Sequence, residues 1–298
     1  MKGAIRYSSE RTLDIDLPEL KEYLFPGAQV LDVGCGSGTI TLDVAKVVQS
    51  GQVTGIDSKP EEIATAQEWA AQSYSGHNVR FMSEDSHELP FPDSSFDLVY
   101  SHTVAHFFLD PQAALLEQKR VVKDGGWVVV SGVRIWPLCI RNPQCPNWDR
   151  VREAGDQATA ATHELFIESG LSPKAFLAKQ LAENPTYAVY SNPNAGAKVT
   201  GWLSSIGLRD ISISVKTERP QFYGSEFMEA SAWDGLPEDE PQNVFEEQIN
   251  KNIADLISLG YIDSDTIQRA IEERNRWYEN PESFFTSFLV FAAGRKEK

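Results

Sequence analysis

The chain has few cysteines and no long run of apolar residues. Its 298 residues include three cysteines, Cys35, Cys139 and Cys145, and an odd number does not suit a disulfide framework. No segment approaches the roughly 20 uninterrupted apolar residues of a membrane-spanning helix. Residues 1–28 also lack the apolar run of a signal peptide. We therefore expect a soluble, cytoplasmic protein with no membrane partner.

Positive charge is also scarce. The chain has 27 Lys and Arg residues against 43 Asp and Glu residues, which gives a formal net charge of -16. A surface that binds nucleic acid through its phosphates needs clustered Lys and Arg, so we do not expect a nucleic-acid partner. Residues 220–250 contain acids but no Lys or Arg, and we interpret them as a solvated acidic face.

One stretch combines the features of a ligand-binding loop. In residues 30–38, an apolar run with Val30, Leu31 and Val33 suits a buried parallel strand. The glycines that follow let the backbone turn sharply and approach a ligand closely. Residues 39–47 have helical periodicity, so unpaired N–H groups at the helix start point back at the turn. This pattern predicts a strand, loop and helix that meet a nucleotide-sized ligand.

The glycine spacing distinguishes two kinds of nucleotide loop. A dinucleotide fingerprint G-x-G-x-x-G that began at Gly34 would need glycine at position 39, which is Thr39. The glycines instead alternate, at Gly34, Gly36 and Gly38, and Asp32 lies two residues before the first. This D-x-G-x-G-x-G pattern resembles motif I of the class I S-adenosylmethionine-dependent methyltransferases. It disfavours the alternative of an NAD-linked dehydrogenase.

A second acid lies at the end of the next expected strand. Residues 53–57 form a short apolar run that ends in Asp57, followed by Ser58. A carboxylate at the tip of the second strand can accept hydrogen bonds from both ribose hydroxyls of a nucleoside. We therefore expect Asp57 to bind the ribose, with Ser58 at the edge of the ligand.

A third acid extends the resemblance. Residues 79–82 predict a third strand, and Asp85, Ser86 and the sequence Leu89-Pro90-Phe91 follow it. In the methyltransferase family an acid at this place accepts a hydrogen bond from the adenine amino group, and an LPF sequence leads into the fourth strand. The resemblance therefore implies that Asp85 and Ser86 lie beside adenine.

The order of the following elements resembles the UbiE-type branch, which acts on small molecules. An expected strand over 96–101 is followed by a helix over 110–122, a turn over 123–126 and an apolar strand over 127–131. Enzymes that methylate amino groups of nucleic-acid bases commonly carry a D/N-P-P-Y/F motif after the fourth strand, where this chain has Ser101-His102-Thr103-Val104. The resemblance covers residues 29–132.

This resemblance implies the fold, the cofactor and most of its contacts. The expected fold is α/β, a Rossmann-like seven-stranded methyltransferase sheet of six parallel strands and one antiparallel strand, with helical cap insertions. The expected cofactor is S-adenosyl-L-methionine. Its expected contacts are Asp32, Gly34, Cys35, Gly36, Gly38, Asp57, Ser58, Asp85, Ser86 and Ser101.

The rest of the chain is expected to complete the core and cover the substrate. We divide it into an N-terminal segment 1–28, the cofactor core 29–132, an aromatic-rich helical cap 133–193 and a C-terminal part 194–298. That last part combines a helix and strand of the core, a second helical insertion over about 220–282 with helices expected over 242–259 and 265–278, and an antiparallel last strand over 284–293.

Two histidines near the fourth strand are candidates for proton transfer. His106 follows the strand on the rim where substrate is expected, and histidine ordinarily titrates near neutral pH. His102 is the second candidate. No Cys or His follows the pair at a metal-binding spacing, so we expect no metal site.

The expected function is methyl transfer to an O, N, C or S atom of a small, partly apolar metabolite. The alternative is a protein that binds the cofactor without transferring methyl, as a regulator, a scaffold or a cyclase. The sequence leaves the identity of the acceptor and the oligomeric state open.

Overall fold

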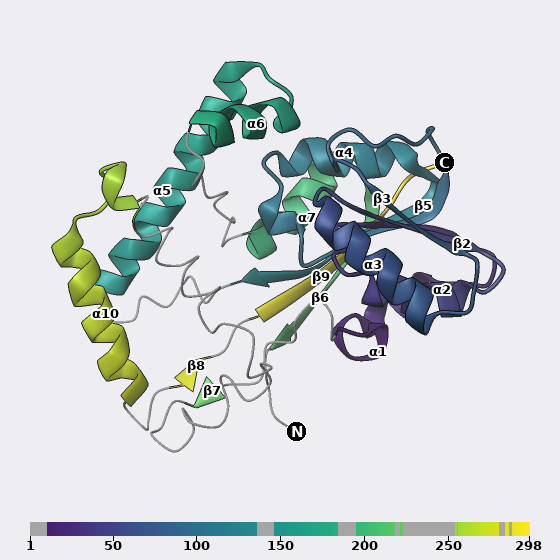
Figure 1. Ribbon diagram of the computed structural model, residues 1–298, viewed down its shortest axis with the longest axis horizontal. Coiled ribbons are helices and arrows are strands. Elements are labelled where there is room, and N and C mark those ends of the chain that lie inside the picture. The colour runs from purple at the N-terminus through teal and green to yellow at the C-terminus, as the bar shows by residue number, and fades with distance from the viewer. Residues whose placement is uncertain are drawn as a thin grey trace. The chain divides into compact units, whose positions relative to one another are not determined.

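The computed structural model describes residues 11–135, 146–183, 195–217, 221–222, 254, 256–279, 284–285 and 288–298 (Figure 1). The chain forms two compact units. The sheet unit contains described residues 11–135, 195–216 and 289–298, and the helical unit contains those of 136–193 and 217–288. Cys139, Cys145 and most of the helix expected over 242–259 lie outside the described residues.

A seven-stranded sheet with the order β3-β2-β1-β4-β5-β9-β6 forms the centre of the sheet unit. Its strands are β1 (Gln29–Val33), β2 (Gln52–Asp57), β3 (Val79–Ser83), β4 (Phe96–His102), β5 (Val122–Ile135), β6 (Arg209–Thr217) and β9 (Phe288–Arg295). Strands β1 to β5 pair in parallel. At the start of β5, Lys296 donates to the Gly126 carbonyl and accepts from the Gly125 N–H, a reciprocal exchange typical of antiparallel neighbours. The expected sheet of six parallel strands and one antiparallel strand is confirmed.

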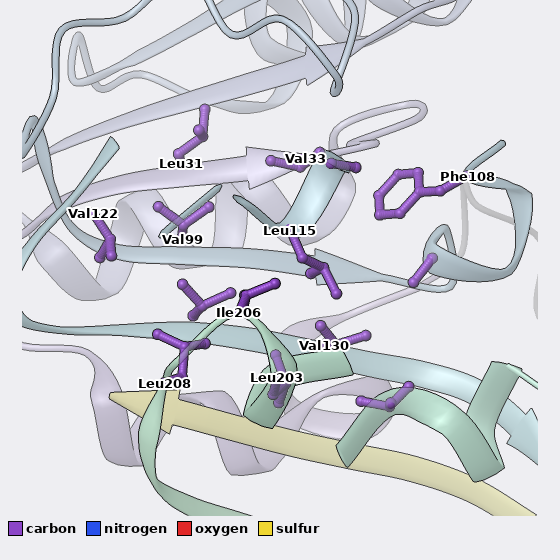
Figure 2. Packing of buried hydrophobic residues seen from close by; sticks show 14 of the residues in the cluster. Leu31, Val33, Val99, Phe108, Leu115, Val122, Val130, Leu203, Ile206 and Leu208 are labelled. Carbon is purple, nitrogen blue, oxygen red and sulfur yellow. The ribbon is translucent and has the colours of Figure 1, made fainter. Parts of the chain in front are cut away.

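Side-chain alternation along the strands produces two apolar layers. The helical elements of this unit are α1 (Leu13–Asp16), the 3-10 helix η2 (Pro18–Tyr23), α2 (Thr39–Val48), α3 (Pro60–Ser73), the 3-10 turn η3 (Ala105–Phe107), α4 (Pro111–Val121) and α7 (Ala195–Ser205). Val30 and Leu98 pack with α1 and α2. Leu31, Val33 and Val99 point to the opposite face and pack with α4 and α7 (Figure 2). Adjacent residues of one strand therefore belong to different layers.

The strand order creates a switch point between β1 and β4. From β1 the chain first adds β2 and β3 on one side, and then returns to add β4 and β5 on the other. In open α/β sheets, ligands bind at such a point, outside the carboxyl ends of the strands. Asp32 of β1 is the register partner of Tyr100 of β4, so both side chains lie beside this point.

Two expected boundaries were wrong. The turn expected over 123–126 is part of β5, because the pairing register shifts between Phe96 and Leu98 and Gly125 adopts a φ of 82°. Such an irregularity accommodates extra residues inside a strand. The single strand expected over 284–293 is divided: β8 (Phe284–Phe285) pairs with β7 (Gln221–Phe222), and β9 begins at Phe288. The sequence of residues 284–293 is mostly apolar on both sides of Thr286 and Ser287 and does not reveal this change of partner.

The helical unit contains α5 (Pro146–Ser169), α6 (Pro173–Glu183) and α10 (Ser264–Glu279). Ala154 and Ala158 of α5 form a small core with Ile267 of α10 and two preceding residues, Leu256 and Ile262. None of the described helices has the length and apolar character needed to cross a membrane.

A buried carboxylate joins α5 to α10. Glu273 is 8% exposed, and its side chain accepts hydrogen bonds from the backbone N–H of Asn147, at 2.8 Å, and from the Asn147 amide. The first N–H groups of a helix have no partner within the helix. Glu273 therefore satisfies the start of α5 from a distant part of the chain.

We predict that Glu273→Ala destabilises the pairing of α5 with α10 by about 1–3 kcal/mol, because it leaves two partly buried donors of Asn147 without this acceptor. Hydrogen exchange at the start of α5 should become faster. The matched control is Glu272→Ala, since Glu272 is exposed and accepts only from Gln268 of its own helix at 3.2 Å among the described contacts. Equal loss of protection in both variants would contradict this role.

Candidate active site

The glycine loop after β1 is fixed by its own chain. The N–H groups of Gly34 and Cys35 both donate to the carbonyl of Ile56, each at 2.8 Å. Gly34 has a φ of 77°, and a Cβ there would lie 2.5 Å from Val104. Gly38 has a φ of 79°, and its Cβ would lie 2.7 Å from the Phe81 ring. Both positions therefore need glycine for backbone conformation and for packing.

Asp32 is a buried acid with two hydroxyl partners. Its side chain is 3% exposed, and its Oδ2 accepts from Thr41 Oγ1 and from Tyr100 Oη, each at 2.6 Å. Burial raises the pKa of Asp32 to about 6, with a smaller upward contribution from Asp57, while the two hydroxyl hydrogen bonds act in the opposite direction. The carboxylate is therefore largely ionised at pH 7.

Asp57, the last residue of β2, holds the glycine loop through a hydrogen bond. Its Oδ2 accepts from the Gly36 N–H at 3.1 Å, and its Oδ1 accepts from the Lys59 N–H at 3.0 Å. A carboxylate has about four acceptor positions. Asp57 can therefore hold the loop and also accept hydrogen bonds from a pair of ligand hydroxyls.

Asp85 has a partner that the sequence analysis missed. His87 donates to Asp85 Oδ1 from its backbone N–H at 2.9 Å, and its ring Nδ1 lies 2.8 Å from the same oxygen. The other ring nitrogen, Nε2, accepts from the Asp110 N–H at 3.4 Å, and the ring packs edge-on against Phe108. Ser86 Oγ lies 3.5 Å from His87 Nδ1. The imidazole thus links the end of β3 to the start of α4.

A pocket opens at the switch point. It is lined by Arg11, Asp32, Gly34, Cys35, Gly36, Thr39, Ile40, Tyr100, His102 and Thr103. Of the predicted site residues, it brings together Asp32, Gly34, Cys35, Gly36 and His102. The predicted residues that do not line it are Gly38, Asp57, Ser58, Asp85, Ser86, Ser101 and His106.

Ser101 differs from its neighbours because side chains alternate along β4. Tyr100 packs with the α2 layer and Val99 with the α4 layer, so Ser101 shares the face of Val99. It is fully buried, and its Oγ has no hydrogen-bond partner among the described residues. Its side chain therefore points away from the pocket that Tyr100 and His102 line.

Arg11 is a second residue that the sequence analysis missed. It lines the pocket and donates to Thr103 Oγ1, which is 92 residues away in the sequence. An isolated arginine near the N-terminus gives no sequence signal for this long-range contact. The pocket therefore presents a guanidinium and the Asp32 carboxylate together, a pair suited to a zwitterionic ligand group.

The two histidines have different surroundings. His102 is 8% exposed, and its Nδ1 lies 3.4 Å from Ser131 Oγ. Burial lowers the pKa of His102 to about 3, with further lowering by Arg11 and Lys216. His106 lies in η3 after β4, with its ring 4.0 Å from that of Phe107, which is 52% exposed. Within the described ranges no three His, Cys, Asp or Glu side chains are grouped as metal ligands.

Comparison with known proteins identifies the family. A family profile described as "Methyltransferase domain" matches residues 24–184. An uncharacterized methyltransferase of Schizosaccharomyces pombe is 37% identical over 197 residues, which cover 64% of this chain and 70% of that protein. A demethylmenaquinone methyltransferase of Staphylococcus aureus is 41% identical over 104 residues, 35% of this chain and 42% of that protein. The chain belongs to the class I S-adenosylmethionine-dependent methyltransferases, in their UbiE-like branch.

Solved structures support the fold. The YcgJ protein of Bacillus subtilis superposes with a TM-score of 0.53 at 19% identity, covering 94% of this chain and 97% of that one. A methyltransferase described as putative, from Bacillus halodurans, gives a TM-score of 0.53 at 16% identity, covering 95% and 99%. YcgJ also matches in sequence, at 38% identity over 104 residues, but the match spans 40% of its length.

The described residues fit the cofactor of this family. S-adenosylmethionine combines a nucleoside with a charged amino acid. Asp57 offers acceptor positions for ribose hydroxyls, while Arg11 and Asp32 offer opposite charges for the amino-acid end. The cofactor expected from the sequence, S-adenosyl-L-methionine, is confirmed by the family to which the chain belongs.

We predict that Asp57→Ala weakens the binding of S-adenosylhomocysteine at least about ten-fold, because hydrogen bonds to a charged group contribute roughly 1.5–3 kcal/mol. Isothermal titration calorimetry measures this loss. Glu61→Ala is the matched control, since Glu61 is exposed at the start of α3 and its removal changes the net charge equally. Unchanged affinity in Asp57→Ala would contradict the proposed ribose contact.

Proposed function

We propose that this enzyme transfers a methyl group from S-adenosylmethionine to an O, N, C or S atom of a small, partly apolar molecule. The observation that carries the proposal is the ring pair after β4, where the half-exposed Phe107 packs against His106. An exposed aromatic ring beside an imidazole suits a substrate that has an apolar body and an ionisable group.

Named relatives support an apolar acceptor. One is a demethylmenaquinone methyltransferase, and another, from Oryza sativa, is named 2-methyl-6-phytyl-1,4-hydroquinone methyltransferase and is 33% identical over 117 residues. The matches span 42% and 34% of these proteins. Because the matches are this partial, they support the acceptor class and not a particular acceptor.

The cofactor supplies an activated methyl group on a positively charged sulfur. The work of the chain is therefore to orient the cofactor, to hold the acceptor in line and to exclude water, which can lower the barrier by roughly 7–11 kcal/mol. Asp57 and Ser58 serve the ribose, Asp85 and Ser86 the adenine, and residues 32–38 the amino-acid end. His87 holds Asp85 in place through two hydrogen bonds.

His106 is our candidate for the residue that removes a proton from the acceptor. It lies in η3, three residues beyond Thr103, which lines the pocket together with Tyr100 and His102 of β4. His102 is the weaker candidate, because an imidazole with a pKa of about 3 has little affinity for a proton at pH 7. We assign His102 to the wall of the pocket.

Acceptor choice belongs to the aromatic-rich segment 133–193 and to the insertion over about 220–282. Loops and insertions on a conserved type of scaffold commonly set substrate choice. The charge of -16 supports a small molecule over a nucleic acid. The cytoplasm is the compartment that we expect from the cysteine content.

The function is tested with S-adenosylmethionine that carries a labelled methyl group. The enzyme is incubated with separate sets of phenols and hydroquinones, amines, thiols and acidic carbon compounds. We expect label in a product of one set. Label in nucleic acid or protein would contradict the proposal, and binding of the cofactor with no labelled product from any set or from a metabolite extract would favour a protein that does not transfer methyl.

We predict that His106→Gln lowers kcat at least about 100-fold and leaves the affinity for S-adenosylhomocysteine unchanged, because general base catalysis typically contributes this much. Single-turnover methyl transfer, once an acceptor is known, measures the loss. His77→Gln is the control, since His77 is exposed beyond α3. A His106→Gln enzyme with the wild-type rate would exclude His106 as the base.

A further inference from the structure

Two buried hydroxyls converge on one oxygen of Asp32. Thr41 Oγ1 comes from the first turn of α2, and Tyr100 Oη comes from β4, and both lie 2.6 Å from Asp32 Oδ2. Thr41 and Tyr100 have no exposed surface, and Asp32 is 3% exposed. Three separate elements therefore meet at this oxygen.

The arrangement is specific for the ionised carboxylate. A hydroxyl donates one proton, and an ionised carboxylate only accepts, so two donors on one oxygen favour the charged form. Within the described residues, both hydrogen bonds to Asp32 end at Oδ2. Oδ1 is thereby left for a ligand in the pocket that Asp32 and Tyr100 line.

We infer that Tyr100 and Thr41 are positioning residues that keep the Asp32 carboxylate ionised and oriented toward the ammonium group of the bound cofactor. The inference concerns the cofactor site alone and is independent of the acceptor and of His106. Neither residue belongs to the glycine motif, and Tyr100 reaches Asp32 from 68 positions away.

Other charged and titratable groups around Asp32 also affect whether its carboxylate is ionised or protonated. Asp57 of β2 acts against ionisation of Asp32, as burial does. The Cys35 thiol has a pKa raised by burial and by Asp32, so it is neutral beside the carboxylate. Arg11 and His102 line the same pocket, and His102 is neutral because its pKa is about 3. Without the hydroxyls, burial and Asp57 would favour the protonated acid.

The test is the pH dependence of S-adenosylhomocysteine binding, measured by calorimetry from pH 5 to pH 8.5. The wild-type affinity should be constant at the upper end and should decrease as the pH falls through about 6, where Asp32 takes up a proton. In Tyr100→Phe the midpoint should move upward by about one pH unit. Affinity would then be about five-fold below wild type at pH 6 and within about two-fold of it at pH 8.5.

Thr41→Val should move the midpoint in the same direction, and Thr41→Ser should restore it. This pair decides the question if Tyr100→Phe does not fold. Tyr23→Phe is the matched control, since the Tyr23 hydroxyl contacts Ser212 at 3.2 Å and does not line the pocket. We expect its midpoint to equal that of the wild type.

A second ligand separates charge recognition from a general effect on the loop. 5′-Methylthioadenosine lacks the amino-acid end, so its affinity should not follow the ionisation of Asp32. A similar pH dependence for both ligands would overturn the inference. So would wild-type midpoints in Tyr100→Phe and Thr41→Val with an equal loss of affinity at every pH, because that result is expected of hydroxyls with a purely structural role. A wild-type protein that binds neither ligand would contradict the cofactor assignment itself.

Discussion

The buried carboxylate of Asp32 is the constraint on which the packing around the switch point depends. A charged group inside a protein is costly unless it is well solvated by hydrogen bonds. Here α2 and β4 each supply one donor to the end of β1. The same bonds fix the positions of these three elements around the switch point, so the requirement for a charge in the pocket and the requirement for a stable core are met by the same atoms.

Two requirements explain the glycines in the loop that follows Asp32: close approach of a ligand and packing within the protein. A glycine-rich turn is usually explained by the close approach of a ligand. In this chain Gly34 and Gly38 are also required by the protein, because a Cβ at either position would overlap with Val104 or Phe81. The loop is therefore held in shape before any ligand binds, and preformed loops lose less entropy on binding. Asp57 strengthens the same effect by accepting from the Gly36 N–H.

From the sequence we could propose those parts of the candidate site that local patterns encode. Strand, glycine turn and helix follow each other within residues 29–48, and acids at strand ends are visible as Asp32, Asp57 and Asp85. The long-range contacts were not predictable, because Arg11 meets Thr103, and Tyr100 meets Asp32, only when the sheet has formed. Ser101 illustrates a second limit: it lies in the fourth strand as expected, but alternation directs its side chain to the other layer.

Cofactor binding and acceptor recognition require different kinds of sequence information. The cofactor is one fixed molecule, so the chain needs a few polar groups at set places along three adjacent strand ends. The acceptor has to be recognised by its own shape, and no short motif encodes that. The relatives are consistent with this difference, since the match to a demethylmenaquinone methyltransferase extends over 104 residues and covers 35% of this chain. The two histidines at and beyond the end of β4 differ in the same way. His102 is buried and neutral, whereas His106 lies beside an exposed aromatic ring. The base that we propose, His106, is a different residue from the buried acid Asp32, so the charge that we propose for cofactor binding is separate from the proton that leaves the acceptor.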